Sequence, residues 1–135
     1  SGQARTPGGL LSTPHDIAVL VLEVMNAYVG KSNRLISRDT AKRMLARQTD
    51  VPPEALGMPL GMGLGVFIDT STDEASFLHP GHNSPGTTFV FLAYPDLGKG
   101  AVIAANGNIG DRLYLEILAS LAIEYGWPSG QPFRQ

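Results

Sequence analysis

The residues best suited to chemistry lie in one short segment, His79 to Gly86, which reads His-Pro-Gly-His-Asn-Ser-Pro-Gly. Its Gly and Pro content predicts a loop between two strands. Gly81 has no side chain, so a substrate can approach the backbone there, and an N–H just beyond it can face a developing oxyanion. His79 lies two residues before Gly81 and is expected on the same face, where its imidazole can donate or relay a proton.

Metal binding is disfavoured for this segment. His79 and His82 are three residues apart, which does not bring two side chains together on a strand or loop. The segment contains no Cys, Asp or Glu to complete a ligand set, and the whole chain has no Cys. We therefore expect neither a metal nor a cofactor.

Ser84 is a weak candidate for a nucleophile. It stands in Gly81-x-x-Ser84-x-Gly86, one residue longer than the G-x-S-x-G elbow. A strand is predicted after it, whereas the elbow is followed by a helix. The simpler role for Ser84 is turn formation between Asn83 and Pro85.

A second short motif, Gly30-Lys31-Ser32, ends like a phosphate-binding loop. Met25 occupies the position of the upstream Gly that this loop requires, and a helix rather than a strand precedes it. We interpret Gly30 as the end of that helix.

The elements that must position the His79 segment are apolar helices and antiparallel strands. Capping residues and a 3.6-residue period predict helices that begin at Thr13, Ser37 and Asp111, and a period of two predicts strands at 63–68, 75–78, 87–94 and 100–105. The first and last helices carry only narrow polar stripes, so each is expected to be buried over most of its circumference. Residues 49–62 are predicted to be a connection, and Pro95-Asp96-Leu97-Gly98 is predicted to be a hairpin turn. This order predicts an α+β fold, an antiparallel β-meander covered by helices.

The composition narrows the range of partners. Hydrophobic residues make up 43% of the 135 residues and charged residues 16%, with a net charge of -2. No long run of one charge sign is present, which argues against a nucleic-acid partner. The apolar stretches are too short for a membrane span.

Several segments together resemble the serine β-lactamase-like family, which includes class C β-lactamases, penicillin-binding proteins, DD-peptidases and related esterases. The residues that carry the resemblance are Pro7 to Ile17, Gly63-Leu64-Gly65, His79-Pro80-Gly81, Ala105-Asn106-Gly107 and the closing helix. They match only the C-terminal part of that fold. The resemblance therefore implies that residues 1–135 are a C-terminal fragment of a single β-lactamase-like domain.

The resemblance also implies roles within the His79 segment. His79-Pro80-Gly81 matches the family's third motif, Lys-Thr-Gly or His-x-Gly, so His79 would position and polarise the substrate and the acid–base groups. Gly81 would leave the backbone open, and the N–H of His82 would be one oxyanion donor. Pro80, Asn83 and Ser84 would line the substrate, although Pro80 replaces the usual hydroxyl residue and the loop to Gly86 is one residue longer than is common.

The family's other two motifs are missing. No Ser is followed three residues later by Lys, and Tyr28 is followed by Val29-Gly30 rather than a Tyr-x-Asn motif. The resemblance thus implies that the intact enzyme acylates an upstream serine with an ester, amide or β-lactam carbonyl of a small or peptide-like substrate. This chain alone is expected to be inactive.

Two alternatives remain open at this point. In the first, the chain is a non-catalytic binding module that keeps the fold of the family. In the second, it self-associates through an uncovered sheet edge. The expected partner is otherwise the missing N-terminal part of the same protein. Many relatives are exported to the bacterial envelope, which favours a periplasmic or secreted location by resemblance only.

Overall fold

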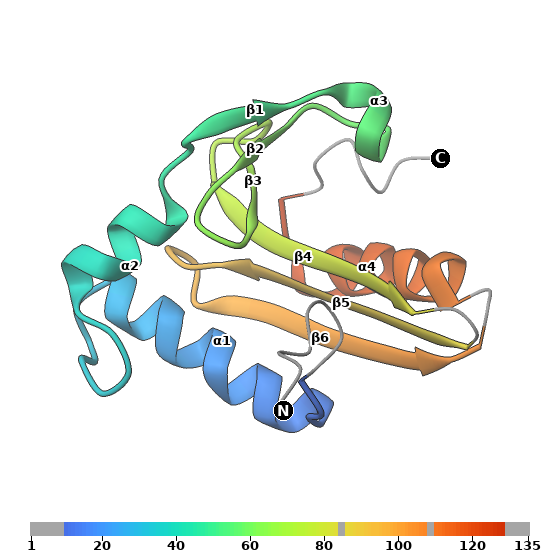
Figure 1. Cartoon of the computed structure of the whole chain (residues 1–135), viewed down its shortest axis with the longest axis horizontal. Helices are drawn as coiled ribbons and strands as arrows, with labels where there is room; N and C mark the ends of the chain where they lie inside the picture. Colours follow the sequence, from blue (N-terminus) through green and yellow to red (C-terminus); the bar gives the residue numbers. More distant parts are fainter. Residues whose placement is uncertain (1–9, 84–85, 108–109, 129–135) are drawn as a thin grey trace, which may run out of the picture.

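The chain is built around a six-stranded antiparallel sheet in which each strand pairs with the next one in sequence, in the order β1-β2-β3-β4-β5-β6 (Figure 1). The computed structural model describes residues 10–83, 86–107 and 110–128. The elements are α1 (Pro14–Tyr28), α2 (Arg38–Leu45), β1 (Thr49–Val51), α3 (Pro53–Leu56), β2 (Leu60–Met62), β3 (Phe67–Asp69), β4 (Ser76–Asn83), β5 (Thr87–Tyr94), β6 (Lys99–Asn106) and α4 (Gly110–Tyr125). The predicted α+β meander is confirmed.

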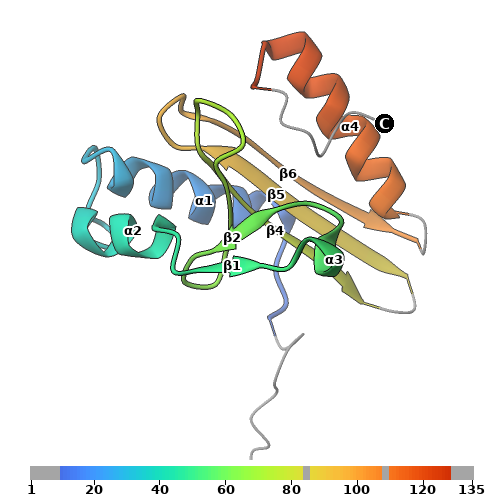
Figure 2. The ribbon, with the colours of Figure 1, turned by 90° about the horizontal axis from the view of Figure 1, so that it is seen from above.

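The two long helices lie on opposite faces of the sheet (Figure 2). On one face, Val21, Val24 and Met25 of α1 pack against Phe77 and Ala93. On the other face, Leu118 and Ala122 of α4, together with Trp127, pack against Val90 and Leu92. Side chains of β4 and β5 alternate between the two cores because successive residues of a strand point to opposite faces.

The helix starts follow local capping chemistry. Thr13 caps α1, because its hydroxyl accepts a 3.1 Å hydrogen bond from the N–H of Asp16. Ser37 caps α2 in the same way, with the N–H of Thr40 as the donor at 3.1 Å. Gly30 follows α1 with φ of 82°, a left-handed conformation that glycine adopts without strain. The predicted starts at Thr13 and Ser37 are confirmed.

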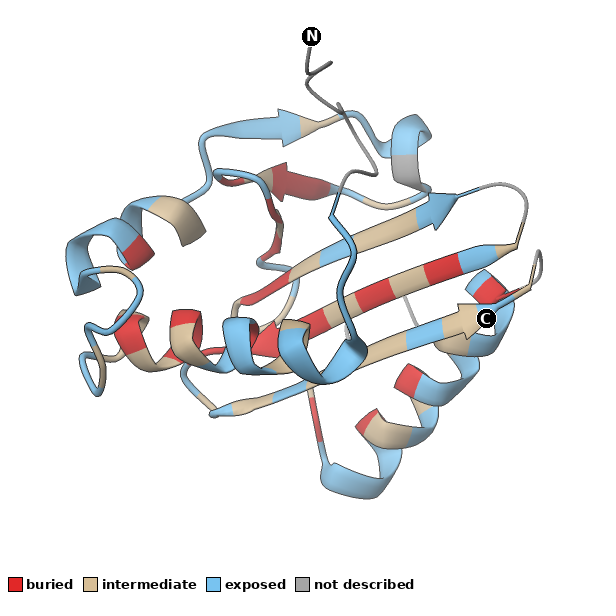
Figure 3. Cartoon of the chain, turned by 60° about the horizontal axis from the view of Figure 1, so that its bottom comes forward, coloured by how far each residue is buried: buried red, intermediate tan, exposed pale blue. Residues whose placement is uncertain are grey.

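The prediction that the long helices are buried on nearly all sides is wrong. Val19, Leu20 and Leu22 of α1 and Leu113 of α4 are each close to half exposed, and Ile123 is 85% exposed. Each helix packs against the sheet on one side, and α1 also contacts α2, but no described residue covers these exposed side chains (Figure 3). None of the described helices is long and apolar enough to cross a membrane.

Three strand boundaries also differ from prediction. The strand predicted at 75–78 continues as β4 to Asn83, so most of the expected loop from His79 is strand. Residues 63–65 form a turn instead, in which Gly63 N–H donates to the Val66 carbonyl, and β3 begins at Phe67. The predicted connection at 49–62 contains β1, α3 and β2.

Candidate functional site

The second half of β4 is an edge of the sheet. β3 pairs with β4 only at Ser76, Phe77 and Leu78. Residues 79–83 pair with β5 on one side, and no described strand pairs with them on the other. Alternate residues of this half therefore direct their backbone groups toward an open side, where a ligand can reach them.

His79 stands on this edge on the α1 side of the sheet. Its Nδ1 lies 3.0 Å from the carbonyl oxygen of Gly65. A carbonyl can only accept a hydrogen bond, so Nδ1 is the donor, and in the neutral imidazole Nε2 is the nitrogen that has the lone pair. The ring is held between Phe67 and Phe91, at centroid distances of 5.8 and 6.2 Å, and it remains exposed. The imidazole is thus fixed in orientation and tautomer, with one nitrogen free to bind or accept a proton.

Gly81 lies two residues further along β4, opposite Phe89. A Cβ built at Gly81 would lie 3.9 Å from the Cβ of Phe89, an ordinary van der Waals distance. The φ of Gly81 is not positive. Neither packing nor backbone conformation within the described chain requires glycine here, so the open space above this backbone is available to a ligand.

The side chain of His82 lies on the opposite face, toward α4. Its Nδ1 is 3.8 Å from Oδ1 of Asp111, and both side chains are about half exposed, so this contact contributes little to stability. The two imidazoles of the His79 segment therefore cannot act together on one atom. Only the backbone of His82 shares the edge with His79.

A small hollow of about 190 Å³ lies beside His82 on the α4 side. Its lining residues are Pro80, Gly81, His82, Thr88, Asp111 and Tyr114. Burial, and secondly the nearby Asp111 carboxylate, raise the pKa of Tyr114 above its ordinary value. A phenol is protonated at neutral pH and can donate a hydrogen bond, and the raised pKa of Tyr114 extends this to more alkaline pH.

Of the remaining predicted residues, the structure describes Asn83 but not Ser84. Asn83 is exposed and ends the strand, opposite Thr87. Ser84 lies outside the described residues, as do Pro7 to Gly9 of the opening motif. Within the described residues, no group of three His, Cys, Asp or Glu side chains is placed to hold a metal ion.

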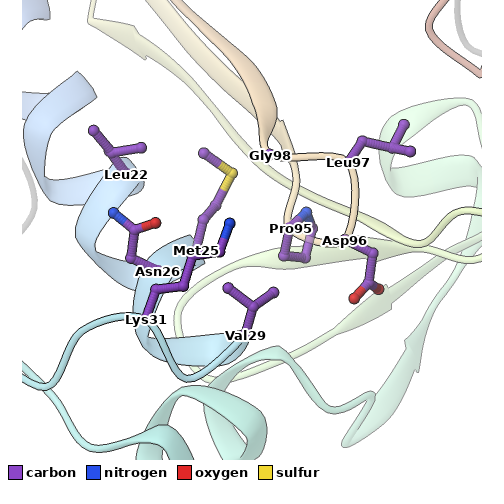
Figure 4. Close-up of a pocket in the computed structure, with 9 residues that line it drawn as sticks. All are labelled: Leu22, Met25, Asn26, Val29, Lys31, Pro95, Asp96, Leu97 and Gly98. Atoms are coloured by element: carbon purple, nitrogen blue, oxygen red, sulfur yellow. The ribbon is translucent and has the colours of Figure 1, made fainter.

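A separate cavity of about 400 Å³ lies between the C-terminal half of α1 and the turn from β5 to β6 (Figure 4). Its lining residues are Leu22, Met25, Asn26, Val29, Lys31, Pro95, Asp96, Leu97 and Gly98. In Figure 4 the side chain of Asp96 points away from the apolar part of the lining. The sequence predicted only a turn at Pro95 to Gly98, because the cavity arises from the contact of two distant elements.

Comparison with protein-family models identifies the family of this chain. Residues 2–123 match the model described as Beta-lactamase. The chain belongs to the beta-lactamase family. Comparison with curated proteins and with solved structures gave no match. As a beta-lactamase family chain, it has a serine hydrolase-like fold, and its matched region includes β4 and the residues that surround His79.

The sequence missed the residues that fix His79. Phe91 could have been found, because the register of a β4–β5 hairpin places it opposite His79 on the same face. Gly65 gave no such signal. Its carbonyl reaches His79 only because the turn before β3 folds back against β4, which is a tertiary contact across 14 residues.

Proposed function

We propose that this chain, residues 1–135, is the C-terminal portion of a beta-lactamase-related serine hydrolase. We further propose that the edge of β4 forms one wall of its acyl-transfer site. The observation that carries the proposal is the exposed, oriented imidazole of His79 beside the uncovered backbone at Gly81. A substrate carbonyl can approach this edge without meeting a side chain at Gly81.

The oxyanion donor in this proposal is the backbone N–H of His82. Proline has no N–H, so within a sheet it belongs on an edge with its nitrogen away from the partner strand. That places the nitrogen of Pro80 on the open side of β4. Because the pattern repeats every two residues, the N–H of His82 faces the same side. The nucleophile's own N–H would be the second donor.

His79 would act on protons through Nε2. With Nδ1–H held by Gly65, Nε2 accepts a hydrogen bond or proton from the nucleophile or a catalytic water and returns it to the leaving group. The serine oxygen forms a bond to the carbonyl carbon and the leaving group departs with a proton. Water then cleaves the ester of the acyl-enzyme and releases the acid.

The serine of this mechanism is not in the chain, because none of its serines is followed three residues later by Lys. We therefore propose that the nucleophile comes from an N-terminal part of the same protein, packed on the α1 side of the sheet where His79 lies. The isolated chain is expected to hydrolyse neither esters nor β-lactams.

The test compares the isolated chain with the longer gene product on a chromogenic ester and a chromogenic cephalosporin. Activity is expected only in the longer protein. There, His79→Gln should lower kcat/KM by about 10²-fold or more, the usual contribution of a proton-transfer group. His15→Gln is the matched control, because His15 is exposed in the first turn of α1 and no role is proposed for it. Equal effects of the two substitutions would contradict the assignment of His79.

A second candidate function is a non-catalytic binding module. Pro80 favours it, since a proline at this position cannot offer the hydroxyl that the family motif usually presents to a substrate carboxylate. This alternative predicts that the longer gene product carries no Ser-x-x-Lys and binds a carbonyl ligand at His79 without turning it over. Activity in the longer protein would exclude it.

A further inference from the structure

Positive charge is concentrated in one short part of the chain. Residues 31–47 contain six of the ten Lys and Arg residues and a single acid, Asp39, which gives a net charge of about +5. The remainder of the chain carries four basic and eleven acidic residues. The near-neutral total therefore hides two regions of opposite charge.

The basic side chains of this part are on the surface. All six are exposed: Lys31, Arg34, Arg38, Lys42, Arg43 and Arg47. Arg34 pairs with Glu23 at 3.6 Å and Arg47 with Asp50 at 2.8 Å. Within the described residues, the other four make no ion pair. Helix α2 turns Ala41, Met44 and Leu45 toward the protein and leaves its cations in solvent.

The connection between α1 and α2 forms an open hollow of about 500 Å³. It is lined by Gly30, Lys31, Ser32, Asn33, Ser37 and Arg38. Arg38 donates from Nε to the carbonyl of Tyr28 at 3.4 Å, which leaves its terminal nitrogens free for another acceptor. Lys31, Arg38 and the amide of Asn33 can donate to a phosphate group, and no carboxylate lines the hollow. The hydroxyls of Ser32 and Ser37 are already hydrogen-bonded, to Glu23 at 2.9 Å and to Thr40 at 2.9 Å.

An apolar side chain projects from the same connection. Leu35 is 58% exposed and lies between Arg34 and Arg38 in sequence. The connection forms one end of the molecule, at the left of Figure 1, far from α4. We call Lys31, Leu35, Arg38 and Lys42 the basic end.

We propose that the basic end docks on an anionic lipid bilayer, with Leu35 entering the interface and the Lys31–Arg38 hollow holding a lipid phosphate. Clustered cations bind anionic membrane surfaces, and an exposed aliphatic side chain among them adds apolar burial. Residues 30–47 contain no aromatic side chain on which a nucleic-acid base could stack. The charge pattern together with Leu35 therefore favours a membrane over a nucleic acid. This proposal is independent of the acyl-transfer site.

Vesicle sedimentation tests the proposal with the 135-residue chain. The chain should sediment with phosphatidylcholine vesicles that contain 30% phosphatidylglycerol, and not with pure phosphatidylcholine vesicles. Raising the salt from 0.1 to 0.5 M should weaken the binding, because salt screens the charges. Sedimentation with both kinds of vesicle, or with neither, would overturn the proposal.

Two variants that each remove two positive charges test whether the basic end is the membrane-binding surface. Removal of one interfacial cation lowers partitioning about five-fold, so Lys31→Gln/Lys42→Gln should bind roughly 25-fold more weakly. The control, Lys99→Gln/Arg112→Gln, removes the same charge elsewhere and should change binding less than about two-fold. Circular dichroism checks that both fold. Equal losses would show general charge attraction and overturn the assignment to the basic end.

A fluorescent variant tests insertion. The native Trp127 is 8% exposed, so the exposed tryptophan of Leu35→Trp gives a separable signal. Its emission should shift to shorter wavelength with anionic vesicles. No shift, or the same shift with inorganic phosphate or single-stranded RNA in place of vesicles, would contradict membrane docking.

Discussion

Replacing Gly81 by Ala should leave the stability of this chain unchanged or slightly higher, whereas replacing Gly110 by Ala should lower it. A Cβ at Gly81 would meet only Phe89, at 3.9 Å. A Cβ at Gly110 would lie 1.6 Å from Oγ1 of Thr88, 2.9 Å from its Cβ and 3.1 Å from the Cβ of Ala105. Thr88 is 1% exposed and has little room to move, so the start of α4 must shift.

The expected magnitudes follow from these distances. Overpacking costs about 1–3 kcal/mol, and the better helix propensity of Ala returns up to about 1 kcal/mol. These ranges together allow a loss of up to about 3 kcal/mol, and their midpoints predict that Gly110→Ala lowers the free energy of unfolding by about 1–2 kcal/mol. At Gly81, a strand residue with an ordinary backbone, Ala should add roughly 0–1 kcal/mol by restricting the unfolded chain.

Urea unfolding followed by Trp127 fluorescence measures both variants. Trp127 is the only tryptophan and is buried against Tyr94, so its emission reports unfolding. The slope of free energy against urea should stay the same, because neither variant changes the surface exposed on unfolding. If Gly81→Ala loses more than about 1 kcal/mol, packing requires this glycine and its assignment to substrate approach fails.

Three further substitutions test the fold around the site. Burial, and secondly Asp69, raise the pKa of Tyr94 to about 12, so the folded state keeps this proton above the ordinary value of 10. The free energy of unfolding should then fall by roughly 2–3 kcal/mol between pH 10 and 12. Urea unfolding at each pH should show a smaller fall for Tyr94→Phe, and an equal fall in the two proteins would contradict this cause. The hydroxyl of Thr88 is buried and has no hydrogen-bond partner within the described residues, so Thr88→Val should be neutral or stabilising in the same assay, and a loss above about 1 kcal/mol would reveal a partner. Thr13→Ala removes the cap of α1 and should cost about 1 kcal/mol in thermal or urea unfolding; no loss would mean that the cap does not stabilise the folded state.

Local patterns predicted the parts of the fold that local chemistry determines. The starts of α1 and α2 follow from their caps, and β5 was predicted at 87–94, as observed, because its apolar run and the Pro95–Gly98 turn lie within one short stretch. The sequence-based prediction ended β4 too early, at residue 78, because Pro80 and Gly81 are typical of loops. Seven partners on β5 hold this stretch as strand, and an edge tolerates proline.

Contacts between distant elements could not be predicted. The burial of α1 and α4 was overestimated, since an apolar pattern does not tell which neighbour covers each face. The positions of His79 and Gly81 on one face followed from the two-residue period. The hydrogen bond from His79 to Gly65, and the cavity between α1 and the β5–β6 turn, depend on how the chain folds back on itself.

Localisation of the acyl adduct by mass spectrometry tests the central proposal most directly. The isolated chain and the longer gene product are each incubated with a fluorophosphonate and with a penicillin, and the modified peptide is sequenced. We expect no adduct on the isolated chain and one on a serine outside residues 1–135 of the longer protein. An adduct on Ser84, or on any other residue of this chain, would contradict the proposal that β4 supplies only a wall of the site.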